Sequence, residues 1–288
     1  MILSQPAKTT DIRASNNIAS QLTEHGTCAV GVFTDKKMAF VIDSRMTLTS
    51  NGKYLGHKEG CKVVLARPKV LLAATGVEDS IYDVNHWNAL EQAQAAMKLL
   101  PENPTYDQLD AWGLQWAQTM WGHYRNSGAK PDYTGVVSQL FVMTKIDGQT
   151  YVLKPTVTWD GVRFGFTSIF AAVSPEASTQ YSGVCRKFVT THDQAGAHPR
   201  EIPVTAEELR EMNAIGDDRV RAQTIGELTD VATRFELKFT AIDERLEGDY
   251  ASIGAPYSTA SWDEGALTWK TKFNPACSAK MTGTVASK

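Results

Sequence analysis

Three residues in the first quarter of the chain, Thr27, Asp43 and Lys62, have the types that an amide-cleaving site needs. A threonine hydroxyl is a weak nucleophile, and the α-amine of the same residue can act as its base when the chain begins there. That amine has an unperturbed pKa of about 7.7 to 8.0, so it can accept a proton near neutral pH. Cleavage between Gly26 and Thr27 would expose the amine, and glycine permits the backbone angles of an internal attack. The pattern therefore predicts self-processing.

Asp43 and Lys62 fit the supporting roles. A lysine near the hydroxyl favours the alkoxide, and an aspartate beside the lysine favours the charged ammonium. Apolar runs at 29–33 and 38–42 flank a polar turn and predict a buried β-hairpin. If residues 33–37 form the loop that closes this hairpin, Thr27 lies opposite Asp43 and the two side chains share a face. A shift of one residue would turn Asp43 to the other face.

The other elements must hold these residues in place. Three- and four-residue apolar spacing predicts helices over 81–100 and 105–120 and a third over 225–242, with a short helix opened by Thr205-x-x-Glu208. The tryptophans of the first two helices suit core packing, with an aromatic groove as the alternative. The order of elements favours an α+β domain with helices layered on sheets. Strands are predicted at 62–66, 70–74, 140–146, 151–153, 169–173, 252–259 and 267–269.

Composition excludes several functional classes. With 29 basic and 32 acidic residues, the net charge of −3 gives no footprint for nucleic acid. Apolar runs fall far short of the ~20 residues of a membrane span, and the N-terminus has no signal-peptide pattern, so we expect a cytoplasmic protein without membrane contact. Neither glycine motifs for phosphates nor histidine spacing for metals occurs, which predicts no cofactor and no metal. The four cysteines are expected to be reduced, with a Cys28–Cys61 disulfide as the alternative.

Four short stretches resemble, in order and spacing, the proteasome β-subunit family of N-terminal nucleophile (Ntn) hydrolases. The resemblance implies a four-layer αββα sandwich, with two antiparallel sheets between helix layers. It is good over 26–100 and poor over 155–222, and the stretch between Asp43 and Lys62 is three residues longer than in typical members. The stretches are Gly26-Thr27-Cys28-Ala29-Val30, Asp43-Ser44-Arg45-x-Thr47, Gly60-Cys61-Lys62-Val63-Val64 and Ala73-Ala74-Thr75-Gly76.

The same resemblance implies a role for each matched residue. Thr27 would be nucleophile and base, Arg45 would help to hold the Asp43–Lys62 pair, and Gly76 would stabilise the oxyanion. Asp249 and Ser252 have the spacing of a later acid and serine near the nucleophile, although Ile253 replaces the expected glycine. Thr47 would bind the substrate backbone, Met46, Ala74, Glu78 and Tyr82 would lie at the substrate pocket, and Ser182 before Gly183 is left unassigned.

These inferences give one leading hypothesis. It is a self-processing threonine peptidase or amidase that acts on a peptide or amide substrate through an acyl-enzyme on Thr27, with homo-oligomer formation possible. The alternative is a catalytically silent, proteasome-like structural or interaction subunit, in which Thr27 is an ordinary strand residue and Lys62 a solvated one. Cys28 is intrinsically the better nucleophile but lies one position too far along. We expect a leader or propeptide at 1–26, a domain at 27–270 with an insertion at about 155–222, and a tail at 271–288.

Overall fold

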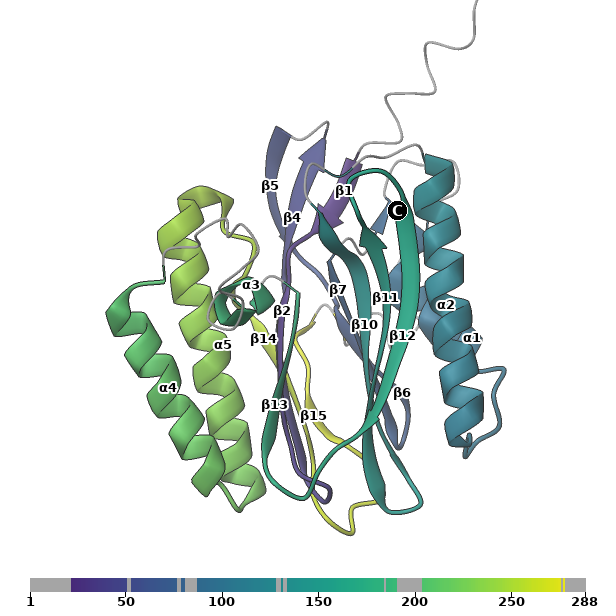
Figure 1. The fold of residues 1–288 in the computed structure, drawn as a ribbon, viewed down its shortest axis with the longest axis vertical. Coiled ribbons are helices and arrows are strands. Elements are labelled where there is room, and N and C mark those ends of the chain that lie inside the picture. Colours follow the sequence, from purple (N-terminus) through teal and green to yellow (C-terminus); the bar gives the residue numbers. More distant parts are fainter. Residues whose placement is uncertain are drawn as a thin grey trace, which may run out of the picture.

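The computed structural model describes residues 22–50, 53–76, 79–80, 87–127, 131, 134–183, 185–190, 204–275 and 277. The described chain is α+β, as expected from the order of its elements (Figure 1). In this part of the chain, none of the helices combines the length and the hydropathy that a transmembrane span requires.

Two antiparallel sheets form the centre. The first, called the β2 sheet, has the order β13-β2-β3-β14-β15, and the second, the β10 sheet, has the order β12-β11-β10-β7-β6. The β2 sheet consists of β2 (Cys28–Phe33), β3 (Met38–Asp43), β13 (Ser178–Gly183), β14 (Tyr257–Trp262) and β15 (Lys270–Lys272). The β10 sheet consists of β6 (Val63–Arg67), β7 (Val70–Gly76), β10 (Gly135–Ile146), β11 (Gln149–Trp159) and β12 (Phe164–Ala172).

Helices cover both sheets. In Figure 1, α4 (Ala206–Arg221) and α5 (Ile225–Glu247) lie to the left of the β2 sheet, whereas α1 (Ala89–Met97) and α2 (Tyr106–Ser127) lie to the right of the β10 sheet. The short α3 (Arg186–Thr190) follows β13. The two faces of β2 contribute to two separate hydrophobic cores. Ala29 and Phe33 pack in the core between the β2 and β10 sheets, and Val30 and Val32 pack in the core between the β2 sheet and α5. Because β2 is buried on both faces, its position is fixed tightly.

A third, smaller sheet lies above the other two. Its order is β5-β4-β1-β8-β9, with β1 (Leu22–His25) antiparallel to both of its neighbours. The neighbours are β4 (Arg45–Ser50) and β8 (Asp79–Ser80), and the outer strands are β5 (Lys53–Glu59) and β9 (Trp87–Asn88). The residues directly before Thr27 therefore form the central strand of this sheet.

The register of the β2–β3 hairpin differs from the expected one by one residue. The pairs are Phe33 with Met38 and Ala29 with Ile42, which places Cys28, and not Thr27, across from Asp43. The difference arises at the turn, where Phe33 stays in the strand as a fully buried residue and the Thr34 amide donates to the Lys37 carbonyl at 2.8 Å. The expected pairing of Thr27 with Asp43 is therefore wrong.

The helix starts show a second difference. The side chain of Asn88 accepts a hydrogen bond from the Glu91 amide at 2.9 Å and caps α1, so the helix begins at Ala89 and not at residue 81. Residues 81–86 lie outside the described part of the chain. The capping box of Thr205 and Glu208 opens α4 as predicted, although the helix is longer than expected.

The cysteines are oxidised, and both the reduced state and the Cys28–Cys61 pairing expected from the sequence are wrong. Cys28 is bonded to Cys185, and Cys61 is bonded to Cys277. We call the second bond the C-terminal disulfide. Sequence reasoning could not give these pairs, because cysteine spacing does not reveal connectivity.

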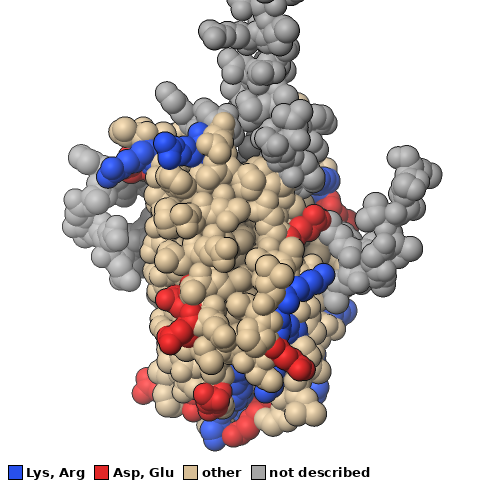
Figure 2. All heavy atoms as spheres, turned by 90° about the vertical axis from the view of Figure 1, so that its right-hand side faces the viewer, with Lys and Arg blue, Asp and Glu red and all other residues tan. Residues whose placement is uncertain are grey.

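The face over α2 and β12 carries few charges (Figure 2). β12 has no charged residue, and those of α2 are Asp107, Asp110 and Arg125. The buried charged residues of the described chain lie elsewhere: Asp43 at the end of β3, Lys62 just before β6, and three acids on α4 and α5 (Glu208, Glu236 and Asp243).

Candidate active site

Asp43, the last residue of β3, is fully buried and held by backbone groups. Its carboxylate accepts hydrogen bonds from the amides of Cys28 at 2.9 Å, Arg45 at 3.1 Å and Gly254 at 3.3 Å. Burial raises the pKa of Asp43 to about 6, although the Lys62 ammonium and the Cys28 amide oppose that rise. The carboxylate therefore changes charge in a pH range in which many hydrolases work.

Lys62 lies just before β6 and places its ammonium among four acceptors. Nζ donates to Oδ1 and Oδ2 of Asp43 at 3.2 and 3.1 Å, to the Gly26 carbonyl at 2.6 Å, and to the Arg45 carbonyl. The side chains of Lys62 and Asp43 are both 0% exposed. These four acceptors compensate part of the desolvation that a buried ammonium undergoes.

Thr27 meets Lys62 at the carbonyl group that precedes it. The Thr27 hydroxyl donates to the Gly26 carbonyl oxygen, which is also an acceptor for Lys62. Gly26 has φ 95°, and a β-carbon there would lie 2.5 Å from the Cβ of Ser252, so no larger residue fits this conformation. The nucleophile, the carbonyl it would attack and a buried cation thus lie together.

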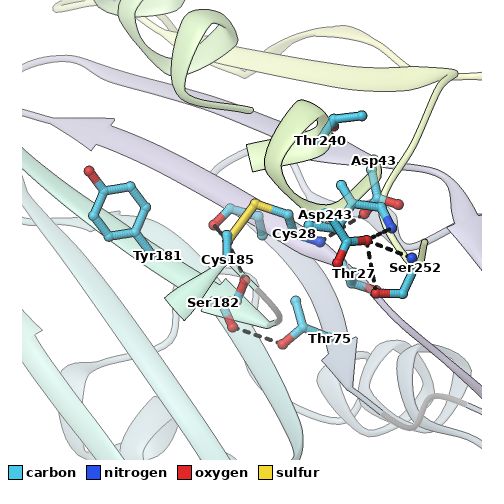
Figure 3. Close-up of a disulfide and its surroundings, with 12 residues drawn as sticks. Thr27, Cys28, Asp43, Thr75, Tyr181, Ser182, Cys185, Thr240, Asp243 and Ser252 are labelled. Carbon is cyan, nitrogen blue, oxygen red and sulfur yellow. Dashed lines mark hydrogen bonds between the residues drawn. A yellow bond between two sulfur atoms is a disulfide. The ribbon is translucent and has the colours of Figure 1, made fainter. Parts of the chain in front are cut away.

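Ser252 lies beside Gly26, but its acidic partner is not Asp249. The Asp243 carboxylate accepts from the Ser252 amide at 2.6 Å and from its hydroxyl at 3.3 Å (Figure 3). Asp249 is exposed in a 3₁₀ turn, where its carbonyl contacts the His57 ring. The structure thus brings Ser252 to the site and leaves Asp249 outside. Sequence reasoning missed Asp243, although it lies four residues after Phe239 on the buried stripe of α5.

Ser182, left unassigned above, is at the other side of Thr27. A β-carbon on the next residue, Gly183, would lie 2.0 Å from the Thr27 carbonyl oxygen, so the two backbones are in close contact. The Ser182 hydroxyl contacts the Thr75 hydroxyl at 2.8 Å (Figure 3). It also donates to the Gln139 side chain at 2.5 Å. Gly76 directly follows Thr75, with φ 88° where β7 pairs with β10. Gly76 is therefore adjacent in sequence to Thr75, the residue that contacts Ser182.

The remaining site residues lie on β4 and β7. Arg45 supports the pair through its backbone, whereas its guanidinium lies over Gly254 and pairs with Glu244 at 3.4 Å. Thr47 is buried, and its hydroxyl has no hydrogen-bond partner among the described residues. Met46 is buried against Gly60, and Ala74 is fully buried, with its amide donating to the Lys62 carbonyl at 2.9 Å. Glu78 and Tyr82 lie outside the described residues.

The C-terminal segment reaches the same site. The Asn274 side chain donates to the Ser44 hydroxyl and to the Gly60 carbonyl at 3.3 Å. The C-terminal disulfide then ties Cys277 to Cys61, next to Lys62. Residues of the expected tail thus hold the neighbours of both Asp43 and Lys62.

One further acid lies close to the Asp43–Lys62 pair. Glu236 of α5 is 0% exposed, and its two carboxyl oxygens have no hydrogen-bond partner among the described residues. Burial raises the pKa of Glu236 well above its usual range and the Asp43 charge raises it further, whereas Lys62 and the backbone amide of Asp43 lower it. No group of three or more potential metal ligands occurs in the described ranges. The chemistry that these residues offer is attack on a carbonyl with buried acid–base support.

Comparisons with known proteins correct the family assignment. No protein-family model and no curated protein matches the chain. Solved structures do match, among them the Anbu (Gly-1) mutant from Hyphomicrobium sp. strain MC1, with 14% identity, a TM-score of 0.45 and coverage of 86% of both chains. Values this low carry no argument about activity. The expected membership of the proteasome β-subunit family is therefore wrong as an assignment, and the function must be argued from the geometry alone.

Proposed function

We propose that the chain is a self-processing N-terminal threonine hydrolase, a peptidase or amidase that forms an acyl-enzyme on Thr27. The observation that carries the proposal is the shared carbonyl oxygen of Gly26, which accepts from the Thr27 hydroxyl and from the Lys62 ammonium at 2.6 Å. A cation at a carbonyl oxygen stabilises the negative charge that develops there during attack. The positive φ of Gly26 places this carbonyl in a conformation that other residues rarely adopt.

Processing then follows in two balanced steps. The Thr27 hydroxyl oxygen attacks the Gly26 carbonyl carbon, the carbon–nitrogen bond breaks, and the departing nitrogen takes up the hydroxyl proton. Water cleaves the resulting ester, which leaves a carboxylate on Gly26 and a free hydroxyl and amine on Thr27. The same amine is then the base for each later substrate, because its ordinary pKa is close to neutral.

The leader strand indicates how a substrate could bind. β1 pairs with β4 on one side and β8 on the other, with His25 opposite Thr47. Release of β1 after cleavage would leave unpaired backbone groups on both neighbours, and an extended peptide can pair with such edges. The buried Thr47 hydroxyl, which lacks a partner among the described residues, would then face the incoming backbone. We therefore propose an extended peptide as the substrate and Gly76 as an oxyanion donor.

The test is the chemical identity of the N-terminus. Intact-mass and N-terminal sequencing of the purified chain should show a species that begins at Thr27, whereas Thr27→Ala should stay whole and Thr27→Ser should still be cleaved. The processed chain should then release the dye from Leu-Thr-Glu-His-Gly joined through an amide to a fluorogenic amine. A soluble wild-type chain that stays intact and releases no more dye than Thr27→Ala would favour the silent interaction subunit.

The proposal has three further parts: the fold family with its segments, the oligomeric state and the cellular location. We propose that the layers of Figure 1 are the αββα sandwich of Ntn hydrolases, with 1–26 as the propeptide and 155–222 as an insertion. Homo-oligomer formation is tested by light scattering before and after processing. The cytoplasmic location stays a prediction, and the two disulfides speak against it, since such bonds are uncommon in the cytosol.

A further inference from the structure

Glu236 is a buried acid that the proposed reaction does not use. It lies on the inward stripe of α5, seven residues before Asp243, and its side chain is out of contact with solvent. Neither of its oxygens has a hydrogen-bond partner in the described part of the chain. An unpaired buried polar group costs about 1 to 3 kcal/mol, so its presence needs an explanation other than stability.

The surroundings of Glu236 contain one cation, which another acid already uses. α5 packs against β2, β3, α4, the 3₁₀ turn Gly248–Tyr250 and β14, and among the described residues the charged groups that act on Glu236 are Asp43 and Lys62. From β14, the Tyr257 hydroxyl faces the same helix and donates to Thr240 at 3.0 Å. The basic residues of α5 nearest in sequence are engaged elsewhere: Arg234 with Asp218 and Asp230, and Lys238 with Glu211.

Charge balance decides which acid keeps its proton. One buried ammonium compensates one carboxylate, and a second uncompensated charge in the interior is strongly disfavoured. Asp43 has three backbone donors as well as both contacts to Lys62, whereas Glu236 has only the nearby Asp43 amide, which makes no regular hydrogen bond with it. Asp43 therefore ionises more readily than Glu236, whose pKa is raised by burial and by the Asp43 charge.

We propose that Glu236 is a positioning residue that sets the upper pH limit of the Thr27 site. As a neutral acid it leaves Asp43 and Lys62 as a balanced pair. When it ionises, a second negative charge acts on the Asp43–Lys62 pair, and the ammonium then stabilises the negative charge that develops on the attacked carbonyl less well. The inference rests on the proposed hydrolase function and adds a regulating group to that site.

The first test is the pH profile of peptide hydrolysis. We expect kcat/KM of the processed wild type to fall on the alkaline side by about tenfold per pH unit beyond the Glu236 ionisation. Glu236→Gln should keep kcat/KM near neutral pH and lose this alkaline fall, while Asp230→Asn, on the exposed side of the same helix, should keep the wild-type profile. Glu236→Met is a second neutral variant in case Gln folds poorly. Coincident profiles for the wild type and a folded neutral variant overturn the proposal.

The second test does not need activity. In the uncleavable Thr27→Ala chain, carboxyl carbon NMR should show one glutamate signal that stays in its protonated position at pH 7 and disappears in Glu236→Gln. A Glu236 signal that titrates in the ordinary range of about 4 to 5 overturns the proposal. If the chain hydrolyses nothing, the hydrolase function and the pH limit fail together. If the chain is active and Glu236 is protonated, but Glu236→Gln has the same pH profile as the wild type, only the proposed role of Glu236 is overturned.

Discussion

Replacement of Lys62 by methionine tests the centre of the site, because it keeps the apolar stem and removes only the ammonium. In the structure the ammonium contacts both oxygens of a fully buried Asp43 and the Gly26 carbonyl. Removal of one partner of a buried ion pair costs about 3 to 5 kcal/mol, because the other charge stays buried without compensation. We expect a loss of that size in the free energy of unfolding at pH 8.

The loss should depend on pH in a defined direction. Burial raises the pKa of Asp43 from 3.8 to about 6, so in the wild type its ionisation removes about 3 kcal/mol of stability as the pH rises between these values. Lys62 lowers this pKa, and in Lys62→Met the carboxyl group therefore keeps its proton to a higher pH. The variant should lose less stability at pH 5 than at pH 8, since a protonated Asp43 needs no cation.

Urea unfolding under non-reducing conditions measures both values, with Thr27→Ala as the background so that every chain is uncleaved. Lys69→Met in the exposed β6–β7 turn is the matched control and should change stability by no more than about 0.5 kcal/mol. With Thr27 intact, Lys62→Met should remain uncleaved by intact mass. A loss below about 1 kcal/mol at pH 8, or cleavage after Gly26 at the wild-type rate, would refute this account of the pair.

Three further changes test the framework around the pair. Gly26→Ala should slow cleavage in a mass-spectrometric time course, because a β-carbon would lie 2.5 Å from the Cβ of Ser252; an unchanged rate would show that the observed φ is not needed. Asp243→Ala should cost about 1 to 3 kcal/mol in urea unfolding, since the part-buried Ser252 amide and the buried Ile253 amide lose their acceptor, while Asp249→Ala should change little; equal effects would contradict the assignment. Cys61→Ser breaks the C-terminal disulfide and should cost about 2 to 5 kcal/mol, and a melting temperature equal to that of the wild type would exclude a stabilising role.

The sequence predicted which residues lie together in the site, but it did not predict the strand register that brings them together. Residue chemistry and motif spacing selected Thr27, Asp43 and Lys62, and the structure brings all three to one carbonyl and one ion pair. The hairpin register was wrong because it depends on whether Phe33 belongs to the strand or to the turn. The apolar pattern alone does not decide that question, whereas burial of Phe33 in the core does.

The acidic residues show a second limit. Asp249 was chosen by its distance from Ser252 along the chain, but α5 continues to Glu247 and a 3₁₀ turn then carries Asp249 to the surface. Asp243 and Glu236 lie on the face of α5 that the helical periodicity predicts to be buried. The periodicity therefore pointed to these two acids, whereas the spacing of an acid and a serine three residues apart pointed to Asp249. An acid on a predicted apolar stripe is therefore a useful candidate for a functional group.

The Lys62–Asp43 pair also explains why the C-terminal segment and both disulfides gather here. A buried ion pair is weak evidence for stability, because desolvation can exceed the attraction between the charges. Such a pair persists only where the surrounding chain prevents its two halves from moving apart into water. Asn274 binds Ser44, next to Asp43, and Gly60, two residues before Lys62, while one disulfide includes Cys61 beside Lys62 and the other includes Cys28 beside Thr27. These restraints come from Cys185 and from Asn274 and Cys277, far along the chain from Asp43 and Lys62, so the site is complete only when the whole fold has closed around it.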